Sequence, residues 1–157
     1  MNVVVIVESC FGNTHHVAQA IADGLREAGG EVSLQLASEA SAEVRADLVV
    51  VAAPTHNLGL PSPSSRGQAA QRGGDVPASG VREWLDATTG SGARLVAIDT
   101  VVAGAFSGSA AKAAQKLARR RGWRAERGPS FVVTSTQGPL RDGELERART
   151  VGRSLLG

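Results

Sequence analysis

The chain has 157 residues, 42% of them hydrophobic and 20% charged, and its formal net charge at pH 7 is +2. This length and apolar content predict a single domain with a buried core over residues 1–157. The mild charge excludes no class outright but gives no reason to expect a nucleic-acid partner. The one basic run, residues 119–121, lies at the end of a predicted helix, where cations are favourable.

The cysteine count and the hydropathy pattern bound the expected location. The chain contains one cysteine, Cys10, so no intrachain disulfide is possible. It shows no basic leader and no apolar run of about 18 residues, the length that a membrane span needs. We therefore expect a cytoplasmic protein with no membrane partner.

Alternating strands and helices are predicted along the whole chain. We expect strands at about residues 2–8, 31–36, 48–53, 94–99 and 123–136, the last broken near Gly128 and Pro129. We expect helices at about residues 14–28, 79–89, 107–121 and 142–156, with a weak helical pattern at 38–46. Residues 54–80 are rich in Gly, Pro, Ser and Gln, which predicts one long irregular segment.

This alternation predicts an α/β fold in which helices cover both faces of a parallel sheet, a three-layer doubly wound sandwich. Right-handed crossovers restrict the topology, and we predict five parallel strands in the order 2-1-3-4-5. In such a sheet the ligand lies outside the carboxyl ends of the strands, at the switch point between the first and third strands. Three loops meet there: the first loop (residues 9–14), the second loop (54–60) and the third loop (99–107).

The first loop has the composition of an anion site. It joins a buried strand to a helix, and the unpaired amide groups at a helix N-terminus favour negative charge. Ser9, Asn13 and Thr14 add side-chain donors, and Gly12 permits close approach or a positive φ. The loop contains no Lys or Arg, so we expect uncharged donors to bind the anion. The alternative is an ordinary strand-to-helix turn capped by Asn13 or Thr14.

Two common phosphate-binding motifs, GxxxxGK[ST] and GxGxxG after a strand, are absent. The stretch instead resembles the flavin mononucleotide (FMN) signature of the flavodoxin family, which runs from an apolar strand through a Ser or Thr, a Gly and a Thr into a helix. The matching residues are Ser9, Gly12, Thr14, Ala18 and Ile21. The departures are Val7, where the family usually has Tyr or Phe, and Phe11, where many members have Thr or Ser.

The resemblance covers nearly the whole chain, since the helix at 107–121 and the C-terminal QGPLRDGELERA also look like actinobacterial-type members. It implies a flavodoxin-like fold with non-covalent FMN, whose phosphate the first loop binds and whose ring the other two loops flank. The residues implied to bind FMN are Ser9, Cys10, Phe11, Gly12, Asn13 and Thr14; Pro54, Thr55, His56, Asn57 and Leu58; and Asp99, Thr100, Gly104 and Phe106.

The aromatic residues that stack on the ring in this family are missing. Leu58 stands where Trp is common, and the chain has no Tyr, which leaves Phe106 as the possible substitute. Each stacked ring pair contributes roughly 0.5–1.5 kcal/mol beyond burial. We therefore expect the first loop to provide more of the affinity, and residues 59–78 either to fold over the ring as a lid or to stay disordered.

The resemblance implies an electron carrier with no catalytic side chain and no metal site. Its partner would be an unidentified redox protein, and its state a monomer or weak homodimer. Carrier flavodoxins are usually acidic, and this chain is not. Two alternatives therefore stay open: a flavodoxin-like NAD(P)H/quinone-type reductase, and a domain that has lost FMN and acts as a binding module.

Two further classes share this topology. Low-molecular-weight tyrosine phosphatases carry Cys-x5-Arg after the first strand, but His16 stands at that spacing from Cys10, so the guanidinium that clamps the phosphoryl group is missing. A response-regulator receiver needs an Asp at the end of the third strand, which here ends at Ala53 and Pro54. Cys10 could have a lowered thiol pKa at the helix N-terminus or serve as a small residue whose amide faces phosphate.

Overall fold

A computed structural model of the chain describes residues 1–90, 92–104 and 108–157. Its strands are β1 (Asn2–Val7), β2 (Glu31–Leu36), β3 (Leu48–Pro54), β4 (Arg94–Val102) and β5 (Arg124–Val133). Its helices are α1 (Asn13–Glu27), α2 (Pro63–Gln71), α3 (Val81–Ala87), α4 (Ala110–Arg120) and α5 (Glu144–Ser154).

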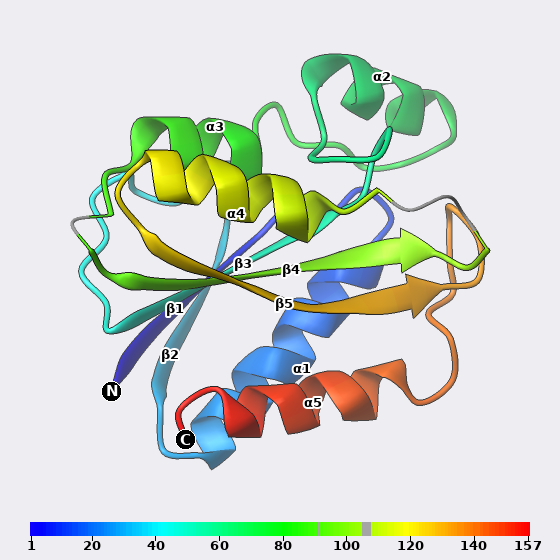
Figure 1. The fold of residues 1–157 in the computed structure, drawn as a ribbon. Coiled ribbons are helices and arrows are strands. Elements are labelled where there is room, and N and C mark those ends of the chain that lie inside the picture. The colour runs from blue at the N-terminus through cyan, green and yellow to red at the C-terminus, as the bar shows by residue number, and fades with distance from the viewer. Residues whose placement is uncertain (91, 105–107) are drawn as a thin grey trace.

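The five strands form one parallel sheet in the order β2-β1-β3-β4-β5, which confirms the predicted topology. Figure 1 shows α1 and α5 on one face of the sheet and α3 and α4 on the other. The chain passes from β1 to β2 on one side and then from β2 to β3 on the other side of β1. The switch point of this sheet therefore lies between the carboxyl ends of β1 and β3. In the same view α2 lies apart from α3 and α4, near the carboxyl ends of the strands.

Strand β3 illustrates why the sheet is apolar on both sides. Val49, Val51 and Ala53 belong to the cluster that packs under α3 and α4. The alternate residues, Leu48, Val50 and Ala52, belong to the cluster that packs on α1 and α5. Because neighbouring side chains point to opposite faces and both faces are covered, every position must be hydrophobic.

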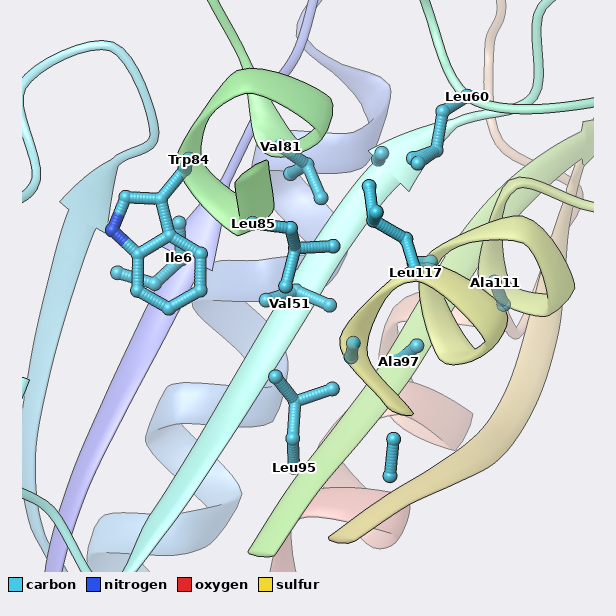
Figure 2. Close-up of a cluster of buried hydrophobic side chains, with 14 of the residues drawn as sticks. Ile6, Val51, Leu60, Val81, Trp84, Leu85, Leu95, Ala97, Ala111 and Leu117 are labelled. Carbon is cyan, nitrogen blue, oxygen red and sulfur yellow. The ribbon is translucent and has the colours of Figure 1, made fainter. Parts of the chain in front are cut away.

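Two short helices cover the first of these faces. Figure 2 shows Val81 and Leu85 of α3 and Leu117 of α4 above Val51 and Leu95 of the sheet. Trp84 is buried in the same cluster, and its indole nitrogen donates a hydrogen bond to the carbonyl oxygen of Ser41 at 3.0 Å. This bond fixes the segment between β2 and β3 against the core.

On the second face, α1 and α5 approach closely through a pair of glycines. A Cβ on Gly24 would lie only 2.0 Å from the carbonyl oxygen of Arg149, and one on Gly152 only 2.2 Å from that of Ile21. No other residue type fits where two helix backbones come this near. At the rim, Glu27 forms ion pairs with Arg149 and Arg153.

The structure differs from the predicted elements in three places. The weak helical pattern at 38–46 was wrong, since no helix forms there and Val44 instead packs on the core from an irregular segment. The segment 54–80 is not irregular throughout, because it contains α2. Strand β5 is not broken at Gly128 and Pro129; the pair is accommodated by a shift in register against β4 between Ala97 and Asp99.

Helix α2 had a local signal that composition concealed. Its N-cap Ser62 accepts a hydrogen bond from the backbone nitrogen of Ser65, and the Ser65 hydroxyl accepts one from the Ser62 nitrogen, a reciprocal capping box. Pro63 occupies the first helical position, where its fixed φ is favourable. The many Gly and Pro residues around this motif favoured a loop, and the capping pattern outweighs them.

Candidate functional site

The first loop reaches α1 without a side-chain cap. Gly12 is the N-cap residue at φ 92°, a left-handed conformation that favours glycine, and neither Asn13 nor Thr14 caps the helix. Ser9 stabilises the turn, since its hydroxyl accepts a hydrogen bond from the Gly12 nitrogen at 3.0 Å. Among the described residues, no acceptor is recorded for the amide groups of Phe11, Asn13 and Thr14. The loop is therefore not an ordinary capped turn, and its amide donors remain available to an anion.

A hollow of about 190 Å³ lies against this loop, at the carboxyl ends of the strands. All three loops contribute to it. Its lining consists of Ser9, Cys10, Phe11, Asn13, Thr14, Pro54, Thr55, His56, Asn57, Ser65, Gln68, Ala69, Arg72, Thr100, Val102, Val133 and Thr136. The structure thus brings together most of the residues that the resemblance implied, at the switch point.

Hydrogen bonds between hydroxyls and backbone tie the three loops to one another. The Thr14 and Thr100 hydroxyls lie 2.8 Å apart in a buried hydrogen bond. The Thr55 nitrogen donates to the Thr100 carbonyl oxygen at 2.9 Å, and the Thr55 hydroxyl accepts from the Ala110 nitrogen at 3.1 Å. These threonines hold the floor of the hollow in place, so part of their hydrogen-bonding capacity is used within the protein.

The second loop forms a tight turn with unusual backbone geometry. His56 and Gly59 pair across it, and the two central residues, Asn57 and Leu58, have φ of 46° and 70°. A left-handed conformation is costly for a bulky residue such as leucine, and such strain is found preferentially at functional sites. Leu58 is also 64% exposed and lies outside the lining of the hollow. It is therefore a solvent-facing apolar side chain beside the hollow.

His56 faces the hollow and bonds to α2. Its Nδ1 lies 2.9 Å from the Ser65 hydroxyl. Burial lowers the pKa of His56, an effect that the nearby Glu8 opposes and Arg66 reinforces. The imidazole is therefore neutral at pH 7 and presents one donor and one acceptor.

The third loop contributes less than the resemblance implied. Asp99 is fully buried, and its Oδ2 accepts hydrogen bonds from the Ser109 hydroxyl at 2.6 Å and the Ala111 nitrogen at 2.9 Å. It therefore supports the start of α4, and neither it nor Gly104 lines the hollow. Phe106 lies outside the described residues. A cofactor contact by any of these three residues stays a prediction.

Helix α2 supplies the residues that sequence reasoning missed. Ser65, Gln68, Ala69 and Arg72 form one wall of the hollow. Val133, the last residue of β5, and Thr136 form another part. The signal that could have found the first group is the capping box at Ser62, because it makes 54–80 a folded segment beside the switch point. Nothing local marks the second group, whose position depends on the pairing of β4 with β5.

A buried ion network holds α2 against the sheet. Arg66 is 3% exposed; its Nε donates to Glu8 Oε2 at 2.7 Å, and its Nη2 donates to Glu83 Oε1 at 2.6 Å. Glu8 is the last residue before the first loop and also accepts from the Val81 nitrogen at 3.0 Å. Gly80 is required here, since a Cβ on it would lie 1.9 Å from Glu8 Oε1. The network joins the end of β1 to α2 and α3, next to the first loop.

Cys10 is a buried free cysteine. Burial, followed by the nearby Glu8 carboxylate, raises the pKa of Cys10 to about 11. The direction of this shift is opposite to the lowered pKa that a helix N-terminus alone would favour. The interpretation of Cys10 as a small residue in the loop fits the structure.

A second hollow, of about 570 Å³, lies on the opposite side of the first loop. Its lining includes the carboxylates Glu8 and Asp75, which disfavour an anion, and it contains no residue of the second or third loop. The smaller hollow, which has no carboxylate among its described lining residues, suits a phosphate better. Over the described ranges, no cluster of potential metal ligands occurs and no helix could cross a membrane.

Comparisons with known proteins agree with this geometry. The family model for flavodoxin matches residues 5–94. Among solved structures, a flavodoxin from the domain Archaea superposes with a TM-score of 0.70 at 19% identity, covering 98% of this chain and 94% of the other. Oxidised Flavodoxin 2 from Bacillus cereus gives a TM-score of 0.71 at 15% identity, covering 97% and 95%. Comparison with curated protein sequences found no match.

The matched region includes the first and second loops and more than half of the chain. The chain belongs to the flavodoxin family, a class of flavin-binding electron-transfer proteins. The sequence resemblance is confirmed at the level of family and fold. The two structural likenesses, at 19% and 15% identity, support the fold alone.

Proposed function

We propose that this protein binds FMN without a covalent link and carries electrons between redox proteins in the cytoplasm. The observation that carries the proposal is the geometry of the first loop. Beside Gly12 at φ 92° its amide groups have no acceptor among the described residues, and the loop borders a hollow at the switch point of a flavodoxin-family sheet. Oriented amide groups at a helix start are the donors that a phosphate monoester requires.

The residues present fit FMN at its phosphate end. The donors of the first loop and the Ser9 hydroxyl would hold the phosphate, and Thr55 and Asn57 of the second loop line the same hollow. A hollow of about 190 Å³ is smaller than the roughly 300–1,000 Å³ of a pocket that encloses a whole ligand. The isoalloxazine ring would therefore extend beyond the hollow, toward the second loop and its exposed Leu58.

Bound FMN supplies the redox chemistry, accepting and returning electrons. The protein contributes position and electrostatics, and no side chain needs to act as an acid or base. Neutral His56 offers a hydrogen bond without adding charge beside the cofactor. The chain would act as a monomer or weak homodimer with a separate redox protein.

The test is to add FMN to purified apoprotein and to follow quenching of flavin fluorescence and the flavin absorbance bands. We expect saturable, stoichiometric quenching. A test variant, Gly12→Ala, should bind FMN more weakly. A Cβ there has room, since its nearest neighbour, His16 Cε1, is 3.9 Å away, but the left-handed φ is costly for alanine. Unchanged flavin fluorescence in the wild type would reject the proposal.

The missing stacking aromatics support one alternative, a domain that has lost FMN and acts as a binding module. The same titration separates the two, since such a module leaves flavin fluorescence unchanged. A flavodoxin-like NAD(P)H/quinone-type reductase would bind FMN as proposed and, in addition, oxidise NAD(P)H with a quinone as acceptor.

A further inference from the structure

Arg72 follows the last residue of α2 and lines the hollow. Of the described lining residues, only Arg72 carries a full charge at neutral pH, because the Cys10 thiol and the His56 imidazole are neutral there. The expectation that uncharged donors alone serve this site came from the first loop in isolation. Tertiary packing adds a guanidinium from a different segment.

The backbone just after Arg72 lies against the first loop. Three residues further along, the Asp75 nitrogen donates to the Cys10 carbonyl oxygen at 2.9 Å. Gly74 lies so close that a Cβ there would be 3.1 Å from the Cys10 carbonyl oxygen and 3.1 Å from Phe11 Cε1. The segment that carries Arg72 is therefore fixed directly on the first loop.

The same residue is held from the other side by the segment after β5. Gln137 donates from its side-chain nitrogen to the Arg72 carbonyl oxygen at 2.9 Å. The next residue, Gly138, lies against the first loop, since a Cβ on it would be 2.7 Å from Asn13 Oδ1. The segment that carries Arg72 and the segment that holds its carbonyl oxygen thus both touch the loop proposed to bind phosphate.

The two arginines of this region, Arg66 in α2 and Arg72 just after it, differ in whether a carboxylate pairs with them. The Arg66 guanidinium is neutralised by Glu8 and Glu83. In the part of the chain that the structure describes, no carboxylate pairs with the Arg72 guanidinium. An arginine without an acidic partner beside oriented amide groups favours a phosphate monoester, which a guanidinium can bind through two parallel hydrogen bonds.

Resting on the FMN-binding function proposed above, we propose that Arg72 binds the phosphate end of the cofactor as a counter-charge that α2 supplies from outside the first loop. Arg72 is then a specificity-determining residue, which makes the protein prefer FMN to riboflavin. Helix α2 then has a role in binding, because it positions this cation at the hollow.

The test compares FMN with riboflavin, which lacks the phosphate, in fluorescence titrations of wild type, Arg72→Gln and Arg45→Gln. Arg45 is a matched control: it is exposed and lies close to Asp47, which bonds Asn2 at the amino end of the sheet, opposite the site. We expect Arg72→Gln to weaken FMN roughly tenfold, the size of a lost charge-assisted hydrogen bond, and riboflavin by about twofold or less. Arg45→Gln should change neither, and the salt dependence of FMN affinity should shrink only in Arg72→Gln.

An equal loss of affinity for both ligands would overturn the proposal, because Arg72 would then act on the ring or on the fold. If Arg72→Gln weakened the binding of neither ligand, the proposal would also be overturned. Inorganic phosphate, followed by NMR of the first-loop amide signals, separates this inference from the proposed function. If wild type ignores both flavins but binds phosphate in an Arg72-dependent way, the FMN function fails and the Arg72 anion site stands. If it binds none of the three ligands, both are overturned.

Discussion

The buried Arg66–Glu8 pair allows a direct test of how α2 is held beside the site. Replacing Arg66 by Met leaves the Glu8 carboxylate, whose side chain is fully buried, with the Val81 nitrogen as its nearest remaining donor. Breaking a buried ion pair in this way costs about 3–5 kcal/mol. The second partner, Glu83, is 35% exposed and adds little, because solvent screens its charge.

The free energy of unfolding, measured by urea denaturation, should therefore fall by about 3–5 kcal/mol in Arg66→Met. For a chain of this length that loss corresponds to a lowering of Tm by about 6–20 °C. A matched surface control is Arg26→Met, which breaks an ion pair between the Arg26 side chain, 43% exposed, and the Asp23 side chain, 45% exposed. That control should cost about 1 kcal/mol or less.

A double variant tests the physical reason. Glu8→Gln combined with Arg66→Met removes the unpaired buried charge but keeps an acceptor for the Val81 nitrogen. We expect it to be clearly more stable than Arg66→Met alone. The reasoning is refuted if Arg66→Met costs as little as the surface control, or if the double variant is no more stable than the single one.

Three further predictions follow from single sites. Gly24→Ala should lower the free energy of unfolding, measured in urea, by about 2–3 kcal/mol, because its Cβ would overlap the α5 backbone. The control Gly67→Ala on α2, whose Cβ would have no atom within 4 Å, should raise it by up to about 1 kcal/mol. Similar effects of the two variants would contradict the close α1–α5 contact. Leu58→Trp should tighten FMN binding roughly 2- to 10-fold by ring stacking, and an unchanged Kd would mean that this position does not face the ring. Hydrogen bonds from Arg147 hold the pKa of Glu144 below its usual value against the effect of burial, with the Val132 nitrogen helping. Its stabilising contribution should therefore be complete above about pH 4.3 and be lost as pH falls through the lower folded value. Glu144→Gln should flatten this part of the acid unfolding curve, and an unaltered curve would argue against it.

The site was predictable where the signal was local. The first loop follows directly from a buried strand, a glycine and a helix start, and the structure gives it the uncapped helix start and left-handed Gly12 that an anion site needs. Asp99 shows the limit of such reasoning. Its place at the end of a predicted strand suggested a ligand contact, which stays a prediction; in the structure its Oδ2 accepts hydrogen bonds from the Ser109 hydroxyl and the Ala111 nitrogen, at the start of α4.

Helix α2 is the clearest failure of composition as a guide. Its Gly, Pro and Ser residues resemble a loop, yet a capping box starts the helix and Arg66 anchors it through Glu8. The partner of Arg66 lies 58 residues away in sequence. No local pattern encodes a contact of that separation, so the capping box could have predicted helix α2 itself but not the ion pair that holds it against the sheet.

Local sequence patterns were enough to predict the order of elements, the doubly wound sheet and the position of the first loop, because hydrophobic periodicity and glycine placement act over a few residues. Packing of distant segments sets which side of that loop opens into a hollow with no carboxylate among its described lining residues, and it brings Arg72 to that hollow. Those features depend on pairing between distant segments, such as Asp75 with Cys10 and Gln137 with Arg72, where burial and charge are set by neighbours remote in the chain.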